Sequence, residues 1–183
     1  MITGKGTNHI VTLLYGIVPF FLANRPPKSW PIVESFFSAL RQSAEGQALP
    51  IGAAGFCWGG KHTVLLAHGA STTTTGGAEK NLIDAGFTGY PSLLEIPTDM
   101  KKITIPMSFA LAELDSGLKG KAIEEVKRAM EGKEDGEVRV YIGAGHGFCA
   151  RADAAVEGSG RQAVEAEEQA VEFFRKYFAA ASS

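Results

Sequence analysis

The sequence predicts an α/β domain in which a mostly parallel sheet is covered by helices on both faces. From about residue 50 to residue 178, segments typical of strands alternate with segments typical of helices, a pattern that favours parallel strands. The strand-like segments are short and apolar, as expected where both faces of a sheet are buried. A chain of 183 residues has the length of one domain at roughly 150 residues per domain.

The composition excludes several classes of protein. Lys and Arg number 18 and Asp and Glu number 20, so the net charge is −2, too balanced for a nucleic-acid binder or a polybasic membrane anchor. The two cysteines, Cys57 and Cys149, are too few for a disulfide scaffold and lack the spacing of metal ligands. We therefore expect no nucleic-acid or membrane partner, no metal, and a cytoplasmic location.

The segment from Ile10 to Ala23 is almost entirely apolar. As a helix it would reach about 21 Å at 1.5 Å per residue, which is short of a roughly 30 Å hydrocarbon core. Lys5 precedes it, as in a secretory signal peptide, but residues 21–25 lack a convincing small-residue cleavage pattern. A buried helix or strand is the expectation, and a signal peptide is the alternative.

The first half of the chain contains one long helix pattern and one strand–helix unit. Ser29 is expected to cap a helix that has Pro31 in its first turn and ends near Gly46. Residues 50–56 are small and apolar, which predicts a strand buried on both faces. Residues 61–68 then predict a helix with an apolar stripe.

The second half repeats the alternation after residues 71–77, a segment rich in Thr and Gly that predicts a surface loop. Strands are predicted at residues 83–90, 103–111 and 137–142, and helices at residues 119–130 and 162–178. Charged and apolar residues alternate in the strand predicted at 137–142, as expected of an outer strand.

The segment Gly55-Phe56-Cys57-Trp58-Gly59-Gly60 lies between the first strand pattern and its helix. This is the layout of a nucleophile elbow, a strained turn that glycines on either side make room for, here with cysteine in place of serine. The N-terminus of the following helix favours a thiolate, and the N–H of Trp58 can face a developing oxyanion. Both features favour acyl transfer. The alternative is a buried structural cysteine in a glycine-rich turn.

Two further residues follow predicted strands at the edge where open α/β sheets place their sites. Asp115 follows the strand at 103–111, and His146 lies between glycines after the last strand. Taken alone, Asp115 is typical of a turn or helix cap, and His146 of a solvated loop. The order Cys57, Asp115, His146 nevertheless matches that of α/β-hydrolase triads. Glu113 is a second choice for the acid.

Several of these segments resemble the dienelactone hydrolase family, and its fungal branch most closely. The resemblance extends from about residue 24 to residue 178. The segments that carry it are residues 24–26, 30–34, 55–61, 90–92, 105–110 leading to Asp115, and 145–148 followed by Arg151.

The resemblance implies an α/β-hydrolase fold and a Cys-His-Asp hydrolase of small-molecule esters or lactones that needs no cofactor. Cys57 would be the nucleophile, His146 the general base and then acid, and Asp115 the residue that orients the imidazole. Arg151 resembles the family arginine that grips a substrate carboxylate, a task suited to its bidentate fork. Without the resemblance, Arg151 is typical of a surface charge, and Cys149 of a packed small residue.

The chain departs from the family before the elbow. Only 56 residues precede Cys57, whereas the family has further N-terminal strands, a loop that supplies a second oxyanion N–H, and an acidic residue that restrains the resting cysteine. We therefore expect an unmatched apolar segment at residues 1–23 and one α/β domain at 24–183 whose sheet lacks its first strands. Residues 10–23 could cover the exposed edge, and an incomplete edge makes a homodimer one option.

Three functions stay open on the sequence alone. The first is a hydrolase of a lactone or small ester that works through a covalent acyl-cysteine. The second is an inactive or weakly active remnant of such a fold that binds small molecules or proteins. The third is a redox-responsive protein in which Cys57 and Cys149 form a reversible disulfide.

Overall fold

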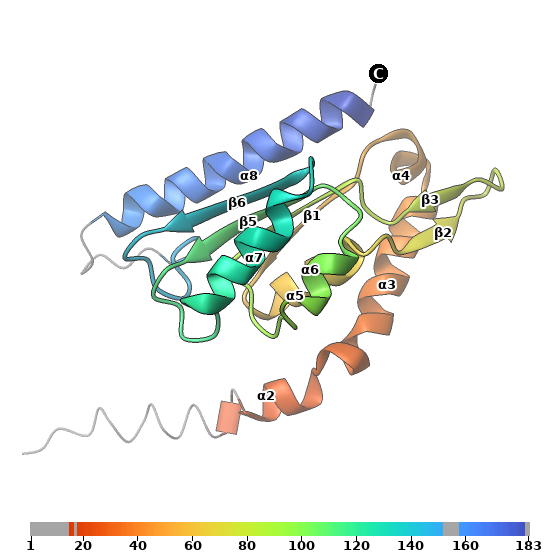
Figure 1. Cartoon of the computed structure of the whole chain (residues 1–183). Coiled ribbons are helices and arrows are strands. Elements are labelled where there is room, and N and C mark those ends of the chain that lie inside the picture. Colours follow the sequence, from red (N-terminus) through yellow and green to blue (C-terminus); the bar gives the residue numbers. More distant parts are fainter. Residues whose placement is uncertain (1–14, 17, 152–157, 182–183) are drawn as a thin grey trace, which may run out of the picture.

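The computed structural model describes residues 15–16, 18–151 and 158–181 (Figure 1). A four-stranded sheet and a small two-stranded sheet are connected by helices. The elements in chain order are α2 (Val18–Ala23), α3 (Pro26–Gln42), α4 (Ala44–Ala48), β1 (Gly52–Phe56), α5 (Trp58–Leu66), β2 (Ser71–Thr73), β3 (Glu79–Asn81), β4 (Ala85–Gly89), α6 (Thr98–Lys102), β5 (Met107–Ala112), α7 (Lys121–Glu131), β6 (Gly136–Tyr141) and α8 (Ser159–Ala181).

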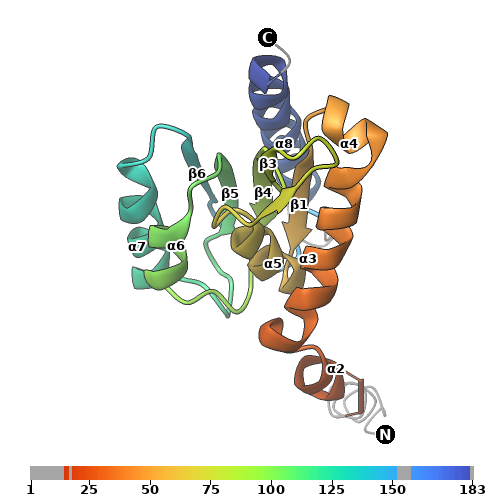
Figure 2. The same ribbon diagram turned by 90° about the vertical axis from the view of Figure 1, so that its right-hand side faces the viewer.

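The main sheet has the order β1-β4-β5-β6, and each neighbouring pair is parallel. Helix α8 covers one face, and α5, α6 and α7 cover the other (Figures 1 and 2). The predicted parallel sheet with helices on both faces is therefore confirmed. Strand β6 lies at one edge of the sheet, as its alternating pattern predicted. At the other edge, no strand in the described ranges pairs with the outer side of β1.

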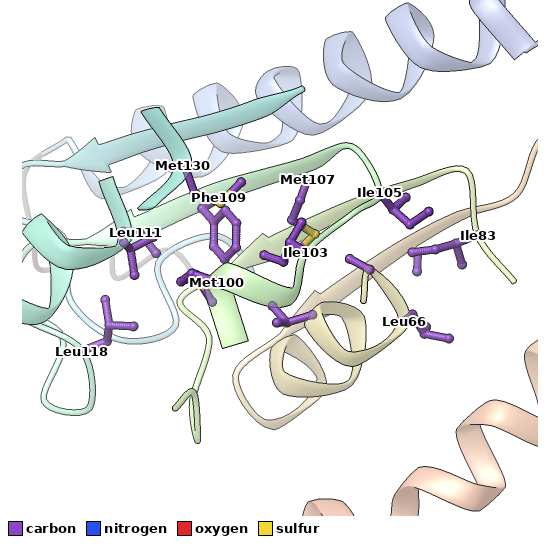
Figure 3. Close-up of a cluster of buried hydrophobic side chains, with 14 of the residues drawn as sticks. Leu66, Ile83, Met100, Ile103, Ile105, Met107, Phe109, Leu111, Leu118 and Met130 are labelled. Carbon is purple, nitrogen blue, oxygen red and sulfur yellow. The ribbon is translucent and has the colours of Figure 1, made fainter. Parts of the chain in front are cut away.

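The core forms on both faces of the two central strands, β4 and β5. Every residue of these strands is buried, which explains why they are small or apolar on both faces apart from Thr88 and Ser108, whose hydroxyls are hydrogen-bonded. Met107, Phe109 and Leu111 point from β5 into the larger cluster, toward Met130 of α7 and Met100 of α6 (Figure 3). The smaller cluster lies on the α8 side and includes Phe87, Tyr141 and Phe148.

Helix α3 begins earlier than predicted. Pro26 and Pro27 occupy its first two positions, where the missing N–H groups would have no helical acceptor, so Ser29 and Pro31 lie inside the helix. The helix ends at Gln42 rather than near Gly46, because the short α4 folds back. A Cβ at Gly46 would collide with the Leu40 carbonyl oxygen, so only glycine permits this close approach.

Two other elements differ from the prediction. Residues 71–73 pair with residues 79–81 as an exposed antiparallel hairpin, although the segment was predicted to be a loop. The short helix α6, which the sequence did not predict, precedes the third predicted strand. That strand, β5, starts at Met107 rather than at residue 103. Both elements are short, so neither carries a periodic pattern long enough to identify it.

The described part of the apolar N-terminal segment is not buried as predicted. None of the six residues of α2 is buried, and its Phe20 ring lies 5.7 Å from the Trp58 ring, edge to face. Residues 10–14 and 17 lie outside the described residues. Within the described ranges, the helices are all too short or too polar to cross a membrane.

Arg41 ties three segments together where the strands begin. Its side chain is buried and donates hydrogen bonds to the carbonyl oxygens of Asn81 (2.8 Å) and Gly46 (3.0 Å). It also forms an ion pair of 2.6 Å with Asp84, whose carboxylate accepts a hydrogen bond of 2.7 Å from the Ile51 backbone. One guanidinium therefore joins α3 and α4 to the starts of β1 and β4.

Replacing Arg41 with methionine should destabilise the fold strongly. The change keeps the apolar stem but removes the charged partner of Asp84, which retains only the Ile51 N–H, and leaves several carbonyl oxygens without their donor, a loss that costs about 3–5 kcal/mol. Urea unfolding followed by circular dichroism measures the change in free energy of unfolding. Arg128→Met on the exposed side of α7 is the matched control and should change it by less than about 0.5 kcal/mol. Equal effects of the two substitutions would contradict this anchoring role.

Candidate active site

The turn at Cys57 has the geometry of a nucleophile elbow. Cys57 separates β1 from α5 and adopts φ 51° and ψ −119°, a conformation that side-chain-bearing residues rarely adopt. A Cβ at Gly55 would lie 2.5 Å from the Gly59 carbonyl oxygen, and a Cβ at Gly60 would lie 2.7 Å from Pro91 Cβ. Glycine is thus required at Gly55 and Gly60, whereas a Cβ at Gly59 would point into open space.

The Cys57 side chain is partly buried and lies against Ser92. Its Sγ is 3.7 Å from Ser92 Oγ, and the Ser92 backbone N–H donates a hydrogen bond of 2.9 Å to the Cys57 carbonyl oxygen. Trp58, the next residue, begins α5, and N–H groups in the first turn of a helix have no acceptor within the helix. The Trp58 N–H is therefore in place to donate to a group bound near Cys57.

His146 is oriented by Asp115. The two side chains meet through His146 Nδ1 and Asp115 Oδ2 at 2.7 Å, and Gly117 N–H donates to the other carboxylate oxygen at 2.8 Å. Asp115 is 2% exposed, whereas the His146 side chain is 29% exposed. This arrangement places a proton on Nδ1 and leaves Nε2 as an acceptor on the open side. Glu113, the alternative acid, accepts a hydrogen bond from Gly143 N–H instead (2.8 Å).

The site residues come from the carboxyl ends of all four parallel strands. Cys57 follows β1, Tyr90 follows β4, Asp115 follows β5 and His146 follows β6. The Tyr90 ring is 4% exposed, and its centroid lies 4.9 Å from the His146 ring, edge to face. In the described part of the chain, the hydrogen-bond partner of the Cys57 thiol is Ser92 rather than the His146 ring.

Comparison with known proteins agrees with this geometry. Residues 24–178 match the model of the dienelactone hydrolase family. The chain belongs to the dienelactone hydrolase family. Family membership and the α/β-hydrolase fold are thereby confirmed, and a hydrolase is the activity that membership supports.

Two fungal relatives of this chain are named as hydrolases. Hydrolase tropI from Talaromyces stipitatus is 32% identical over 152 residues, which are 80% of this chain and 53% of that protein. Hydrolase pyvD from Aspergillus violaceofuscus is 24% identical over 140 residues, 76% of this chain and 51% of that protein. The chain spans about half the length of the curated relatives it matches.

Solved structures show the same fold at low sequence identity. A dienelactone hydrolase-like promiscuous phosphotriesterase from metagenomic libraries has a TM-score of 0.63 at 19% identity, covering 92% of this chain and 68% of that one. Butyrate-bound esterase 2 from Thermogutta terrifontis has a TM-score of 0.55 at 16% identity, covering 78% of this chain and 64% of that one.

Arg151 lies in the same loop as His146. Its backbone N–H donates to the Gly147 carbonyl oxygen at 2.8 Å, and a Cβ at Gly147 would lie 3.4 Å from its guanidinium. Burial raises the pKa of Tyr90, the nearby Cys149 raises it further, and the positive charge of Arg151 opposes this rise. The positive charge of the exposed Arg151 guanidinium therefore lies near enough to Tyr90 to influence its pKa.

Cys149 packs as a small residue, in keeping with the sequence expectation. It belongs to the cluster on the α8 side, and a Cβ at Gly89 would lie 2.8 Å from its Sγ. Burial raises the pKa of the Cys149 thiol to about 12. At neutral pH this thiol stays protonated and is a poor nucleophile.

The sequence analysis missed the residues that hold the first turn of α5. The Trp58 indole donates to the Asn24 carbonyl oxygen at 2.8 Å and packs on the His62 ring at a centroid distance of 4.2 Å. His62 is 3% exposed and bonds to Ser29 Oγ at 2.8 Å. Burial lowers the pKa of His62. The described residues include no group of three or more His, Cys, Asp or Glu arranged to hold a metal.

Iodoacetamide at about pH 8 should alkylate Cys57 and leave Cys149 unmodified. Because the pKa of Cys149 is about 12, only about one in ten thousand of its thiols is ionised at that pH. Cys57 is only partly buried and stands at the elbow, where turns of this kind carry their nucleophile. Peptide mass spectrometry after digestion locates the label. Cys57→Ala should remain unlabelled, and equal labelling rates at the two positions would show the assignment to be wrong.

Proposed function

We propose that this chain is a hydrolase that cleaves a lactone or small ester through Cys57, His146 and Asp115. The observation that carries the proposal is that these residues follow β1, β5 and β6 at the same edge of one parallel sheet, in triad order, with His146 Nδ1 and Asp115 Oδ2 2.7 Å apart. Membership of the dienelactone hydrolase family and the names of the two fungal relatives support it.

The proposed reaction has two halves. His146 Nε2 takes the proton of the Cys57 thiol as sulfur attacks the substrate carbonyl carbon, and the same proton then passes to the departing alkoxide oxygen. The product of this half is a thioester. In the second half His146 removes a proton from water, the hydroxide attacks the thioester, and the carboxylic acid leaves as the proton returns to sulfur. Asp115 keeps Nδ1 protonated and stabilises the imidazolium throughout.

Trp58 is proposed to stabilise the oxyanion of both tetrahedral intermediates. Its N–H is left without a helical partner at the start of α5 and follows the nucleophile directly, as in other elbows. The family resemblance assigns a second donor to a loop that the sequence does not match. Loss of one oxyanion donor lowers rates about 100- to 1000-fold, so the Trp58 N–H is expected to contribute a factor of this size.

Arg151 points to the substrate class. The exposed Arg151 guanidinium on the His146 loop can donate two parallel hydrogen bonds to a carboxylate. This favours a lactone or short ester that carries a carboxylate group. The esterase and phosphotriesterase named among the structural neighbours act on electrophilic carbonyl or phosphoryl centres, which is compatible with a nucleophile at this turn.

The absence of cofactor, nucleic-acid and membrane partners and the cytoplasmic location stay predictions.

A non-catalytic binding protein is the second candidate. Two observations favour it: among the described residues no strand pairs with the outer side of β1, and the Cys57 thiol contacts Ser92 rather than His146. This alternative keeps the fold and the side chains but predicts slow or absent acylation of Cys57.

Mixing the protein with 4-nitrophenyl acetate should distinguish the two candidates. For the hydrolase, intact mass spectrometry should show one acetyl group on Cys57 within the first turnover, and release of nitrophenol should continue. Cys57→Ala should show neither. His146→Ala should lower turnover roughly 100- to 10,000-fold, because both halves of the reaction lose their base.

Cys149→Ala is the matched control, since it removes the other thiol but should retain acylation and turnover. Circular dichroism establishes that each variant is folded. A folded wild-type protein that shows neither acylation nor release would favour the binding protein.

A homodimer through the outer side of β1, which no strand of the described residues pairs, is also proposed. Helix α3 exposes Ile32 (73%) and Phe36 (62%) one turn apart, an apolar surface that contact between two copies would bury. Light scattering after size-exclusion chromatography should therefore give twice the monomer mass of 19.4 kDa. Phe36→Glu should restore the monomer mass, and a monomeric wild-type protein would exclude this contact.

A further inference from the structure

We propose that Ser92 is a positioning residue for Cys57, that its hydroxyl stabilises the thiolate, and that a buried ion pair fixes the segment that carries it. This inference deepens the proposed function and rests on Cys57 being its nucleophile. Neither the triad prediction nor the names of the relatives assigns a role to Ser92.

Ser92 contacts Cys57 through both its backbone and its side chain. The backbone N–H donates to the Cys57 carbonyl oxygen at 2.9 Å, and the hydroxyl oxygen lies 3.7 Å from Sγ, within hydrogen-bond range for sulfur. The hydrogen bond to the Cys57 carbonyl oxygen fixes the Ser92 backbone beside the elbow, and the Ser92 hydroxyl lies next to the thiol. Two contacts from one residue leave the hydroxyl little freedom to point elsewhere.

The segment from Tyr90 to Asp99 is held against α5 at both ends. Near its start, Pro91 packs so closely on Gly60 that a Cβ there would lie 2.7 Å away. At its other end, the Asp99 carboxylate accepts two hydrogen bonds from Lys61 Nζ, at 2.9 and 2.7 Å, and one from the Glu95 backbone N–H at 2.6 Å.

This ion pair is buried and lies one helical turn beyond the nucleophile. Lys61 is 5% exposed and Asp99 is 3% exposed, so solvent screens their attraction little. Because Cys57 is the residue directly before α5 and Lys61 lies in the first turns of that helix, the pair fixes the segment relative to the thiol. His68, just after the end of that helix, also bonds to the Asp99 carbonyl oxygen at 3.0 Å. Ser92 is distant from Cys57 in the sequence and comes close to it because the segment from Tyr90 to Asp99 packs against α5.

The hydroxyl matters most when the sulfur is charged. A thiol can donate or accept a hydrogen bond, but a thiolate can only accept, and Ser92 then supplies the donor. The proton of Cys57 moves to His146 Nε2, while Ser92 keeps its own. A hydrogen bond to the charged form favours that form, so Ser92 raises the fraction of thiolate available for attack. Once the thioester forms, the sulfur has lost its charge and the bond weakens.

The pH dependence of Cys57 alkylation tests this role. In a Cys149→Ala background, Ser92→Ala should lower the rate of alkylation by iodoacetamide at pH 7 roughly three- to tenfold and move the midpoint of the rate profile upward by about 0.5 to 1 pH unit. Ser92→Thr, which keeps the hydroxyl, should restore the profile. The other titratable groups gathered around this site, Tyr90, His146 with Asp115, and Arg151, are unchanged in both variants.

Ser71→Ala on the exposed strand β2 is the matched control for removal of a hydroxyl and should leave the profile unchanged. An unshifted midpoint in Ser92→Ala would overturn the proposal even if turnover fell, because that result indicates a structural role only. Ester turnover measured alongside separates the two proposals. A shifted midpoint without turnover in the wild-type protein would sustain the role of Ser92 and contradict the hydrolase.

Discussion

The backbone turn at Cys57 is the constraint on which the site depends. A non-glycine residue at φ 51° costs about 1–3 kcal/mol, and such a turn persists only where its surroundings fix it. Here the Cys57 N–H bonds to Gly89 of β4, its carbonyl accepts from Gly60 and Ser92, and β1 is paired along its length with β4. The close approach at Gly55 and Gly60 lets α5 start immediately after the strand. The turn therefore directs the thiol to the edge where the strands end.

The parallel sheet brings the remaining groups to that edge. In a parallel arrangement every carboxyl end lies on the same side, so residues that follow β4, β5 and β6 meet although they are 25 or more residues apart in sequence. The two central strands are wholly buried, which gives Tyr90 and Asp115 rigid supports. His146, on the loop after the outer strand, gains its orientation from Asp115 and from the Tyr90 ring.

The sequence predicted the parts of this arrangement that have local causes. The elbow at Cys57 is a motif, and Asp115 and His146 could be placed because each follows a strand pattern. The start of α3 could not be fixed, since Pro26, Pro27 and Pro31 each suit the first turn of a helix. The burial of Lys61 and His62 was missed because partners come from distant segments, Asp99 of α6 and Ser29 of α3. Thr-rich residues 71–73 are equally typical of a loop and an exposed hairpin. Long-range contacts of this kind leave no period in the sequence.

The helices before β1 act on the elbow through Trp58 rather than through the sheet. The Asn24 carbonyl accepts the indole N–H, and Ser29 holds the His62 ring that packs beneath the indole. On the same helix, Lys61 binds Asp99 and with it the segment that carries Ser92. The first turn of α5 is therefore fixed by two parts of the chain, the helices before β1 and the residues after β4. That turn follows Cys57 directly and carries the Trp58 N–H, so both sets of contacts fix the two groups that are proposed to attack a substrate carbonyl and to bind its oxyanion.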